Sequence, residues 1–255
     1  MDSLERWSFM KVFVLSYILM LAPLVGRADL FVDDHVTRTV MTENERHLPV
    51  VQVAKSSGIL LGESLLLTAQ HTTKNWQSYS YQGATMFYGP HNDHYYFKFE
   101  SIIEEDAALD YAIVRISWKN GVIPPGLQWV KSIVMPGEIK LGVIHTMDIF
   151  TLGSPWDKIP NPMKSSGSKI VILPDSQIKY PLLFNAGVIE GNSGGPIFTA
   201  DGKLLGIVTG GPHKLGEPGW EGNDPNKIES WNWGTPIQNI FKISKVLQEL
   251  FPRGE

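Results

Sequence analysis

The stretch "EGNSGGPIF", residues 190–198, surrounds a single serine with small, turn-forming residues. Glycines lie on both sides of Ser193, and because they lack Cβ atoms the chain can take a tight turn that points amide N–H groups into one hollow. Two such donors, the amides of Gly191 and Ser193, would stabilise an oxyanion, each contributing on the order of 3 kcal/mol in a transition state. Taken by itself, the stretch fits a glycine-rich β-turn better, so a nucleophilic serine requires partners elsewhere in the chain.

Two upstream segments supply candidate partners, a base and an acid. His71 follows the apolar run "LLLTAQ", where a rigid strand can aim an imidazole. Asp110 directly precedes the strand-like run "YAIVRI", and a buried carboxylate there can hold the imidazole's tautomer and stabilise the imidazolium. Asp106 is a rival for this role, but choosing it would leave Asp110 unpaired beside an apolar run, which is costly. Alone, His71 fits an ordinary core-edge histidine and Asp110 an ordinary turn aspartate.

Taken together and in chain order, the three segments are much more specific. "TAQH", "DYAIV" and "GNSGGP" resemble the histidine, aspartate and serine motifs of the chymotrypsin-like (trypsin-fold) serine endopeptidases. Subtilisin-like enzymes and α/β-hydrolases arrange their triads in other orders. With no cysteine, the chain looks most like the bacterial branch of Deg-type proteases and glutamyl endopeptidases. Further segments similar to that branch are "TLGSP" (151–155), "DGKLLGIVTG" (201–210) and "WGTPI" (233–237), and the resemblance covers roughly residues 45–250.

The resemblance implies a serine endopeptidase that hydrolyses peptide bonds through an acyl-enzyme and needs no cofactor. His71 would act as general base and then general acid, Asp110 would orient it, and Ser193 would attack the substrate. Proteins or peptides are the implied partners. The alternative is a non-catalytic secreted binding protein that retains the protease fold. The intact triad argues against it, because degenerate members usually lose one of the three residues.

Short β-type runs separated by turn residues predict an all-β fold. The expected strands cover residues 48–54, 58–69 (a hairpin), 84–89, 94–103, 111–116, 139–153, 169–173, 181–187, 195–210 and 233–237. Convincing helical spacing of apolar residues occurs only at 237–251. The resemblance implies two six-stranded antiparallel β-barrels with the triad in the cleft between them and a C-terminal α-helix. We therefore expect a trypsin-like serine protease domain at 48–251, with barrel one at about 48–122 and barrel two at about 126–236.

The resemblance also assigns a set of substrate-binding residues: Gly187, Val188, Glu190, Val208, Thr209, Gly210 and Gly211. Glutamyl endopeptidases place a histidine and a hydroxyl residue where this chain has Val208 and Val188. Trypsin-like enzymes place an aspartate where Gly187 falls. This chain lacks both the histidine and hydroxyl of glutamyl endopeptidases and the aspartate of trypsin-like enzymes. We therefore expect a preference for a neutral, apolar P1 residue of modest size.

Three of these residues carry further expectations. Glu190, near the mouth of the pocket by the same alignment, would disfavour acidic substrates. Thr209 either hydrogen-bonds the buried aspartate, as a hydroxyl often does in the family, or is an ordinary strand threonine. Gly211 would let a substrate strand pair with the neighbouring backbone.

The N-terminus predicts an export signal. Basic residues precede an apolar core at 12–25, and "GRA" puts small residues at the usual positions before a cleavage site after Ala28. The core is shorter than the roughly 18 residues that a membrane-spanning helix needs, so no stable span is expected after cleavage. We expect a signal peptide at 1–28 and a secreted or periplasmic protein, with an uncleaved anchor as the alternative. Residues 29–47 are then an N-terminal arm or a short propeptide whose removal would activate a latent enzyme.

Charge and composition argue against other classes of function. The net charge of −4 and the lack of a dense basic run give no basis for nucleic-acid binding. The segment "HNDH" brings His91 and His94 beside Asp93, but with no further ligand at a clear spacing it favours a solvated loop over a metal site. We therefore predict no bound metal. The absence of cysteine means that the core alone must stabilise the exported fold, which suits a bacterial protein better than a eukaryotic extracellular one.

Overall fold

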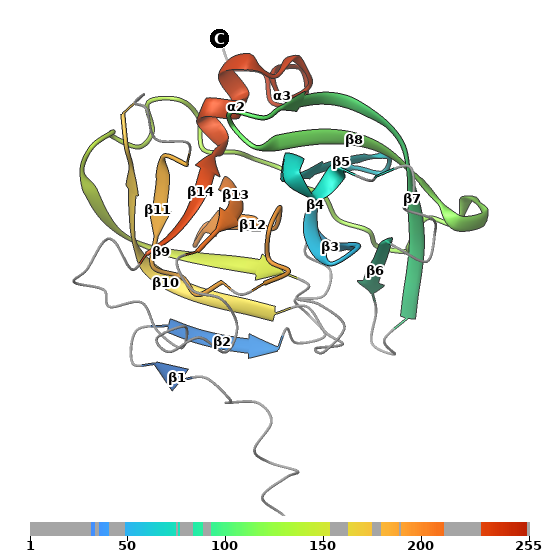
Figure 1. Cartoon of the computed structure of the whole chain (residues 1–255), viewed down its shortest axis with the longest axis horizontal. Coiled ribbons are helices and arrows are strands. Elements are labelled where there is room, and N and C mark those ends of the chain that lie inside the picture. The colour runs from blue at the N-terminus through green and yellow to red at the C-terminus, as the bar shows by residue number, and fades with distance from the viewer. Residues whose placement is uncertain are drawn as a thin grey trace, which may run out of the picture.

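The computed structural model describes residues 32–33, 36–40, 49–74, 76, 84–88, 93–153, 163–174, 180–188, 190–211 and 231–253. The predicted signal peptide at 1–28 and His91 of the rejected metal candidate lie outside these residues. Most regular secondary structure in the described part is β, with helices in short turns and at the C-terminal end (Figure 1).

The first six-stranded unit is a closed antiparallel barrel in the order β3-β4-β5-β8-β7-β6. Its strands are β3 (Val50–Val53), β4 (Ser56–Gly62), β5 (Leu65–Thr68), β6 (Ala84–Tyr88), β7 (Asp93–Asp106) and β8 (Tyr111–Trp118). Alternate residues of β8, such as Ala112 and Val114, join the apolar cluster inside this barrel. Tyr111 and Ile113, which alternate with them in sequence, join a second cluster that reaches barrel two. β8 is therefore buried on both faces, which explains its near-continuous apolar sequence.

The second six-stranded unit follows the first along the chain. Its strands are β9 (Ile144–Gly153), β10 (Met163–Ile172), β11 (Leu182–Phe184), β12 (Pro196–Thr199), β13 (Leu204–Gly210) and β14 (Asn232–Pro236). The pairings run β10-β11-β14-β13-β12-β9, and β9 pairs again with β10, so the six strands form a ring. The prediction of an all-β fold with two six-stranded antiparallel barrels is confirmed.

A short N-terminal hairpin extends the second sheet. Its strands are β1 (Val32–Asp33) and β2 (Val36–Val40). β2 pairs with residues 163–165 of β10, while β11 pairs with residues 170–172 of the same strand. The hairpin thus lies beside a part of β10 that β11 does not reach (Figure 1). That residues 29–47 are removable as a propeptide stays a prediction.

The C-terminal helix begins where predicted but is interrupted. The structure has α2 (Ile237–Ile243) and α3 (Lys245–Leu250) in place of one helix over 237–251. Ser244 between them is extended, with φ −79° and ψ 117°, and its hydroxyl accepts a hydrogen bond from the Leu247 amide at 3.1 Å. A serine side chain that caps a new helix competes with continuation of the old one. The apolar spacing continues through this break, so spacing alone could not reveal it. Within the described residues, no helix is long and apolar enough to cross a membrane.

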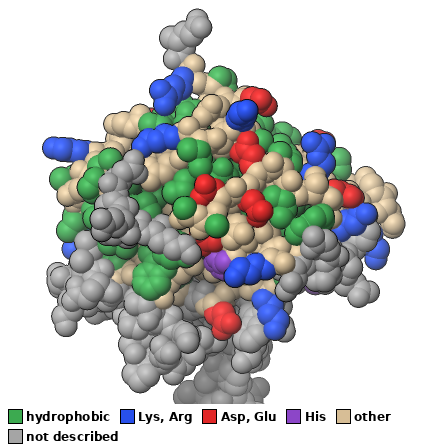
Figure 2. Space-filling view, turned by 45° about the horizontal axis from the view of Figure 1, so that its top comes forward, with side chains coloured by type: hydrophobic (Ala, Val, Ile, Leu, Met, Phe, Trp, Pro, Cys, Tyr) green, Lys and Arg blue, Asp and Glu red, His purple; other side chains and the backbone are tan. Residues whose placement is uncertain are grey.

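The two barrels share one apolar cluster. Ile59, Leu67 and Ile113 from barrel one pack in the same buried cluster as Leu152 and Ile207 from barrel two. Burial of this continuous apolar surface fixes the barrels against each other, so loops at the shared edge are held by both. On the face drawn in Figure 2, acidic and basic side chains are interspersed, with no large field of one sign among the described residues of that face.

Candidate active site

The candidate base lies in a short helical turn, η2 (Gln70–Thr73), directly after β5. Buried hydroxyls close this turn: Thr72 Oγ1 donates to the Ala69 carbonyl at 2.7 Å and lies 3.0 Å from Thr68 Oγ1. The neighbouring residues are therefore firmly held, whereas the His71 side chain keeps 40% of its surface exposed. The sequence folds here into a well-held turn that presents an accessible imidazole.

The candidate acid occupies an unusual backbone conformation. Asp110 has φ +53°, in the left-handed region that few residues other than glycine adopt, although aspartate tolerates it better than most. Residues 106–110 form a turn, called the acid turn below, which is closed by Asp106: its Oδ1 accepts from the Leu109 amide at 2.8 Å. The Asp110 carbonyl accepts from the Gln70 amide at 3.1 Å, and the residue is only 2% exposed. The acid is thus buried and tied directly to the turn that carries the base.

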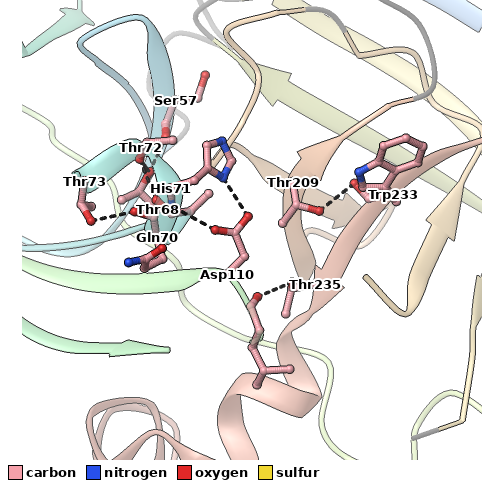
Figure 3. Close-up of polar contacts among 12 residues, drawn as sticks. Ser57, Thr68, Gln70, His71, Thr72, Thr73, Asp110, Thr209, Trp233 and Thr235 are labelled. Carbon is pink, nitrogen blue, oxygen red and sulfur yellow. Dashed lines mark hydrogen bonds and ion pairs between the residues drawn. The ribbon is translucent and has the colours of Figure 1, made fainter. Parts of the chain in front are cut away.

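The structure brings His71 and Asp110 into direct contact. Asp110 Oδ2 lies 2.8 Å from His71 Nδ1, and Oδ1 accepts from the His71 backbone amide at 2.9 Å (Figure 3). An ionised carboxylate only accepts hydrogen bonds, so with a neutral imidazole this contact requires the proton on Nδ1 and leaves Nε2 as an acceptor. This pair can therefore hold the imidazole in the tautomer that a general base requires.

Residues 191–195, called the serine segment below, lie at the junction of the barrels. Ser57 of barrel one donates its amide to the Ser193 carbonyl at 2.8 Å and its hydroxyl to the Gly191 carbonyl at 2.7 Å. Gly194 has φ +81°, and a Cβ there would lie 2.2 Å from Thr68 Oγ1. The glycine is therefore required for close approach as well as for conformation. The segment packs against the strand end that precedes His71.

The amides around Ser193 fall into two groups. Those of Gly194 and Gly195 donate to the Val208 and Asn192 carbonyls at 2.7 and 2.8 Å. Among the described residues, no acceptor is found for the amides of Gly191 and Ser193, the predicted oxyanion donors. Nor does a hydrogen bond within that set join the Ser193 hydroxyl to the imidazole of His71.

The segment before the serine, residues 185–188, is held by side chains from neighbouring strands. The Gly187 amide donates to Ser165 Oγ at 2.9 Å, and its carbonyl accepts from Thr151 Oγ1 at 3.3 Å. The Ala186 carbonyl accepts from Asn232 Nδ2 at 2.8 Å. Ser165, Thr151 and Asn232 are all buried, so the position of this backbone depends on three inaccessible polar groups.

Most of the predicted substrate-binding residues lie near one another. A Cβ on Gly211 would lie 3.2 Å from Val188 Cγ2 and 2.2 Å from Asn232 Oδ1, so the segments before and after the serine meet there. Gly187 and Val208 are buried, Val188 and Gly211 are partly exposed, and Glu190 is exposed. Gly210 packs against the Trp233 ring.

Thr209 does not contact the acid. Its hydroxyl donates to the Trp233 carbonyl at 3.2 Å, across the β13–β14 pair, rather than to Asp110 (Figure 3). The hydroxyl that does reach the acid turn belongs to Thr235, which donates to the Leu109 carbonyl at 2.5 Å. No local sequence pattern marks Thr235 for this role, because it lies far from Leu109 along the chain.

Two other residues near the site were missed or given a different role. Asp106 caps the acid turn, and the "DAALD" spacing of three residues from Asp106 to Leu109 is a signal that could have identified it. Ser57 lies in a strand segment with no distinguishing pattern. Burial, with the carboxylates of Glu104 and Asp106 nearby, raises the pKa of Tyr111 to about 12, so its hydroxyl stays neutral.

Among the described residues, no group of three or more His, Cys, Asp or Glu side chains is placed to hold a metal ion.

A family model for the trypsin-like peptidase domain matches residues 56–207, a range that contains all three candidate triad residues. The chain belongs to the trypsin-like peptidase family. A glutamyl endopeptidase of Staphylococcus epidermidis, found also in two of its named strains, is 27% identical over 161 residues. That match covers 61% of this trypsin-like peptidase and 54% of the relative, so the chain spans about half the length of the curated relatives it matches.

Among solved structures, this trypsin-like peptidase is similar to the HtrA-type protease AlgW, determined with a decapeptide. The two share 19% identity over 76% of this chain and 51% of that chain, with a TM-score of 0.49.

Proposed function

We propose that this trypsin-like peptidase is a serine endopeptidase with a His71–Asp110–Ser193 triad. The observation that carries the proposal is the two-point contact of the Asp110 carboxylate with the imidazole and amide of His71, next to a serine segment that spans the barrel junction. Family membership supports the same class of chemistry. A structural histidine would not need a buried carboxylate and a left-handed acid turn to hold its tautomer.

The chemistry then proceeds in two halves. Nε2 of His71 takes the proton of Ser193 as Oγ attacks the peptide carbonyl, and the amides of Gly191 and Ser193 donate to the resulting oxyanion. The imidazolium, stabilised by Asp110, gives its proton to the leaving amine, which leaves an acyl-enzyme. Water, deprotonated by the same imidazole, then attacks the acyl group, and the imidazolium returns the proton to Ser193 Oγ as the acid product leaves. General base catalysis of this kind contributes roughly 10²–10⁴-fold to the rate.

The contact between Ser193 and the imidazole forms, in this proposal, when substrate binds. Catalytic hydrogen bonds are often long or poorly aligned in substrate-free enzymes and tighten in the complex. The amides of Gly191 and Ser193 support this, because donors that have no acceptor within the described part of the chain are available to a substrate oxygen.

For specificity we propose a neutral, apolar P1 residue of modest size. The side chains at the relevant positions, Val188 and Val208, are apolar, and Gly187 carries none. The curated relative is named for glutamyl residues, but this chain lacks the histidine and hydroxyl that glutamyl endopeptidases place at those positions. We propose further that Glu190, which is exposed, disfavours acidic substrates, and that the Thr209–Gly211 backbone pairs with the substrate.

We also propose that the protein is exported, with cleavage after Ala28, and acts in the periplasm or outside the cell. The apolar core at 12–25 and the small residues Gly26 and Ala28, which precede the expected cleavage site, support a signal peptide. N-terminal sequencing of the exported protein should return Asp29, or a residue near 48 if residues 29–47 are a propeptide. A protein retaining Met1 would contradict export by cleavage.

Labelling with a fluorophosphonate probe tests the triad. The wild-type protein should react, whereas Ser193→Ala should not, with circular dichroism confirming that both are folded. If folded, correctly processed wild type stays unlabelled, the non-catalytic binding protein is the better account. Cleavage of a peptide library then tests specificity, and dominant cleavage after Lys, Arg or Glu would overturn the neutral P1 proposal.

A further inference from the structure

We propose that Thr235 is a positioning residue for Asp110, acting from barrel two on the acid turn of barrel one through the Leu109 carbonyl. This inference rests on the proposed function, because it names what holds the acid of that triad in place. Thr235 is fully buried on β14, and its hydroxyl donates to the Leu109 carbonyl at 2.5 Å (Figure 3).

The contact matters because of where the Leu109 carbonyl lies. The Leu109 carbonyl carbon and the Asp110 nitrogen lie in the same peptide plane, and both atoms define the φ angle of Asp110. A contact that fixes this plane therefore restrains that angle. That angle is +53°, a conformation that costs roughly 1–2 kcal/mol in a residue with a Cβ. Such strain persists only where the surroundings over-determine the backbone. Thr235 holds the peptide before Asp110, and Gln70 holds the carbonyl after it.

Backbone angles at Asp110 determine where its carboxylate points. The Cα–Cβ direction follows from φ and ψ, and the carboxylate must meet both the amide and the Nδ1 of His71 at 2.9 and 2.8 Å. If Leu109 lost its donor, the acid turn could relax toward an unstrained φ and withdraw one or both contacts. The Asp106 cap on the Leu109 amide would remain, so the turn would loosen rather than unfold.

Thr235 also gives the acid a connection to the barrel that carries the serine. β14 is paired with β13, and the Val208 carbonyl on β13 accepts from the Gly194 amide beside Ser193. The acid turn and the serine segment are therefore both hydrogen-bonded to the β13–β14 strand pair. Small displacements of catalytic groups, of about 1 Å, can reduce rates by roughly 10²-fold, so this common support has a function in catalysis.

A matched pair of variants isolates the hydroxyl. Thr235→Ala and Thr235→Ser both remove the methyl group, but only Thr235→Ser keeps the donor to Leu109. Ser244→Ala is the control, because Ser244 is another fully buried residue whose hydroxyl joins two parts of the fold. It lies between α2 and α3 and donates to Glu104 Oε2 of β7 at 2.6 Å, outside the acid turn. All are made in the full chain and assayed with a peptide that the wild type cleaves.

We expect Thr235→Ala to lower kcat about tenfold with KM nearly unchanged, and Thr235→Ser to restore most of that loss. Ser244→Ala should lower the melting temperature about as much as Thr235→Ala does, but it should keep the wild-type kcat. Equal kcat values for Thr235→Ala and Ser244→Ala would overturn the inference, since the Thr235 hydroxyl would then be only structural.

A measurement independent of activity separates this inference from the proposed function. In ¹⁵N-histidine-labelled protein, the Nδ1 proton of His71 should resonate far downfield because it is hydrogen-bonded to Asp110. Thr235→Ala should shift that signal upfield or broaden it, and Thr235→Ser should not. Wild type that fails to react with fluorophosphonate would end the proposed function, whereas an unchanged Nδ1 signal in Thr235→Ala would end the positioning role alone.

Discussion

The two halves of the candidate site are built in different ways. Barrel one contributes side-chain chemistry, in which the carboxylate of Asp110 grips both the backbone and the ring of His71. Barrel two contributes mainly backbone, in which glycine conformation and close packing set the position of the Ser193 segment. The first half should therefore be sensitive to the chemical identity of a side chain, and the second to added volume.

This difference follows from what each half must do. A proton relay needs ionisable groups with defined tautomers, and only side chains supply these. Oxyanion stabilisation needs preorganised N–H donors, which the backbone supplies without mobile side chains. Substitutions that alter chemistry without volume, or volume without chemistry, can separate the two.

The largest effect is expected from Asp110→Asn, which changes the chemistry of the acid–base half at constant volume. A carboxamide that accepts only through its oxygen and donates through its nitrogen would favour the tautomer with the proton on Nε2, and that tautomer cannot accept the serine proton. We expect kcat to fall about 10⁴-fold while the fold is retained. Peptide hydrolysis and thermal unfolding measure the two quantities.

Asp106→Asn is the control for that variant. Its amide oxygen can still accept from the Leu109 amide, so most activity should survive. If Asp106→Asn proved the more damaging of the two, the acid would have been assigned to the wrong residue.

The next largest effect is expected from Gly194→Ala, which adds volume to the backbone half without changing its chemistry. The new Cβ would lie 2.2 Å from Thr68 Oγ1 and 2.4 Å from the Ser57 carbonyl oxygen, at a φ of +81°. We expect a loss of at least about 3 kcal/mol in the free energy of unfolding, together with loss of labelling at Ser193. Urea unfolding and probe labelling would measure both.

Gly202→Ala is the control for Gly194→Ala. Gly202 has nearly the same φ, +83°, but a Cβ there meets nothing within 4 Å. It should therefore show only the backbone cost of about 1–2 kcal/mol and normal labelling. Equal losses for the two glycines would show that conformation, and not close packing, sets the serine segment.

The smallest effect is expected from Ser165→Ala, which removes the acceptor of the Gly187 amide. An unpaired buried amide costs about 1–3 kcal/mol, and the loosened segment should raise KM for peptides several-fold. The rate of labelling by a small fluorophosphonate, which does not occupy the specificity pocket, should change little. Ser166→Ala, at the exposed neighbouring position, serves as the control. A fall in labelling rate as large as the rise in KM would mean that this segment supports the nucleophile as well.

Local pattern was sufficient for much of the fold. Apolar runs such as "LLLT" and "YAIV" identified strands, because burial on both faces leaves few polar positions. Strand ends were less well predicted: β9 begins at Ile144, after a turn that includes Gly142 at φ +75°, and not at residue 139. The C-terminal helix was placed correctly at its start but not at its break, which depends on the hydrogen bond of one serine hydroxyl.

For the site, residue types and their chain order were enough to nominate His71, Asp110 and Ser193. The sequence could not show how they are supported. Ser57 and Thr235 contact the serine segment and the acid turn from the opposite barrel, so neither has a local signal. Thr209, which a resemblance connects to the acid, instead bonds to the Trp233 carbonyl.

The sequence by itself determined where most of the strands lie along the chain, the glycines that the serine turn requires, and the identity of the groups able to carry chemistry, because these depend on local conformation and residue type. Only the tertiary structure decided which hydroxyl reaches the acid turn and how closely His71 meets Asp110. Those contacts join residues far apart along the chain, and their geometry depends on how the two barrels pack against each other through the shared apolar core.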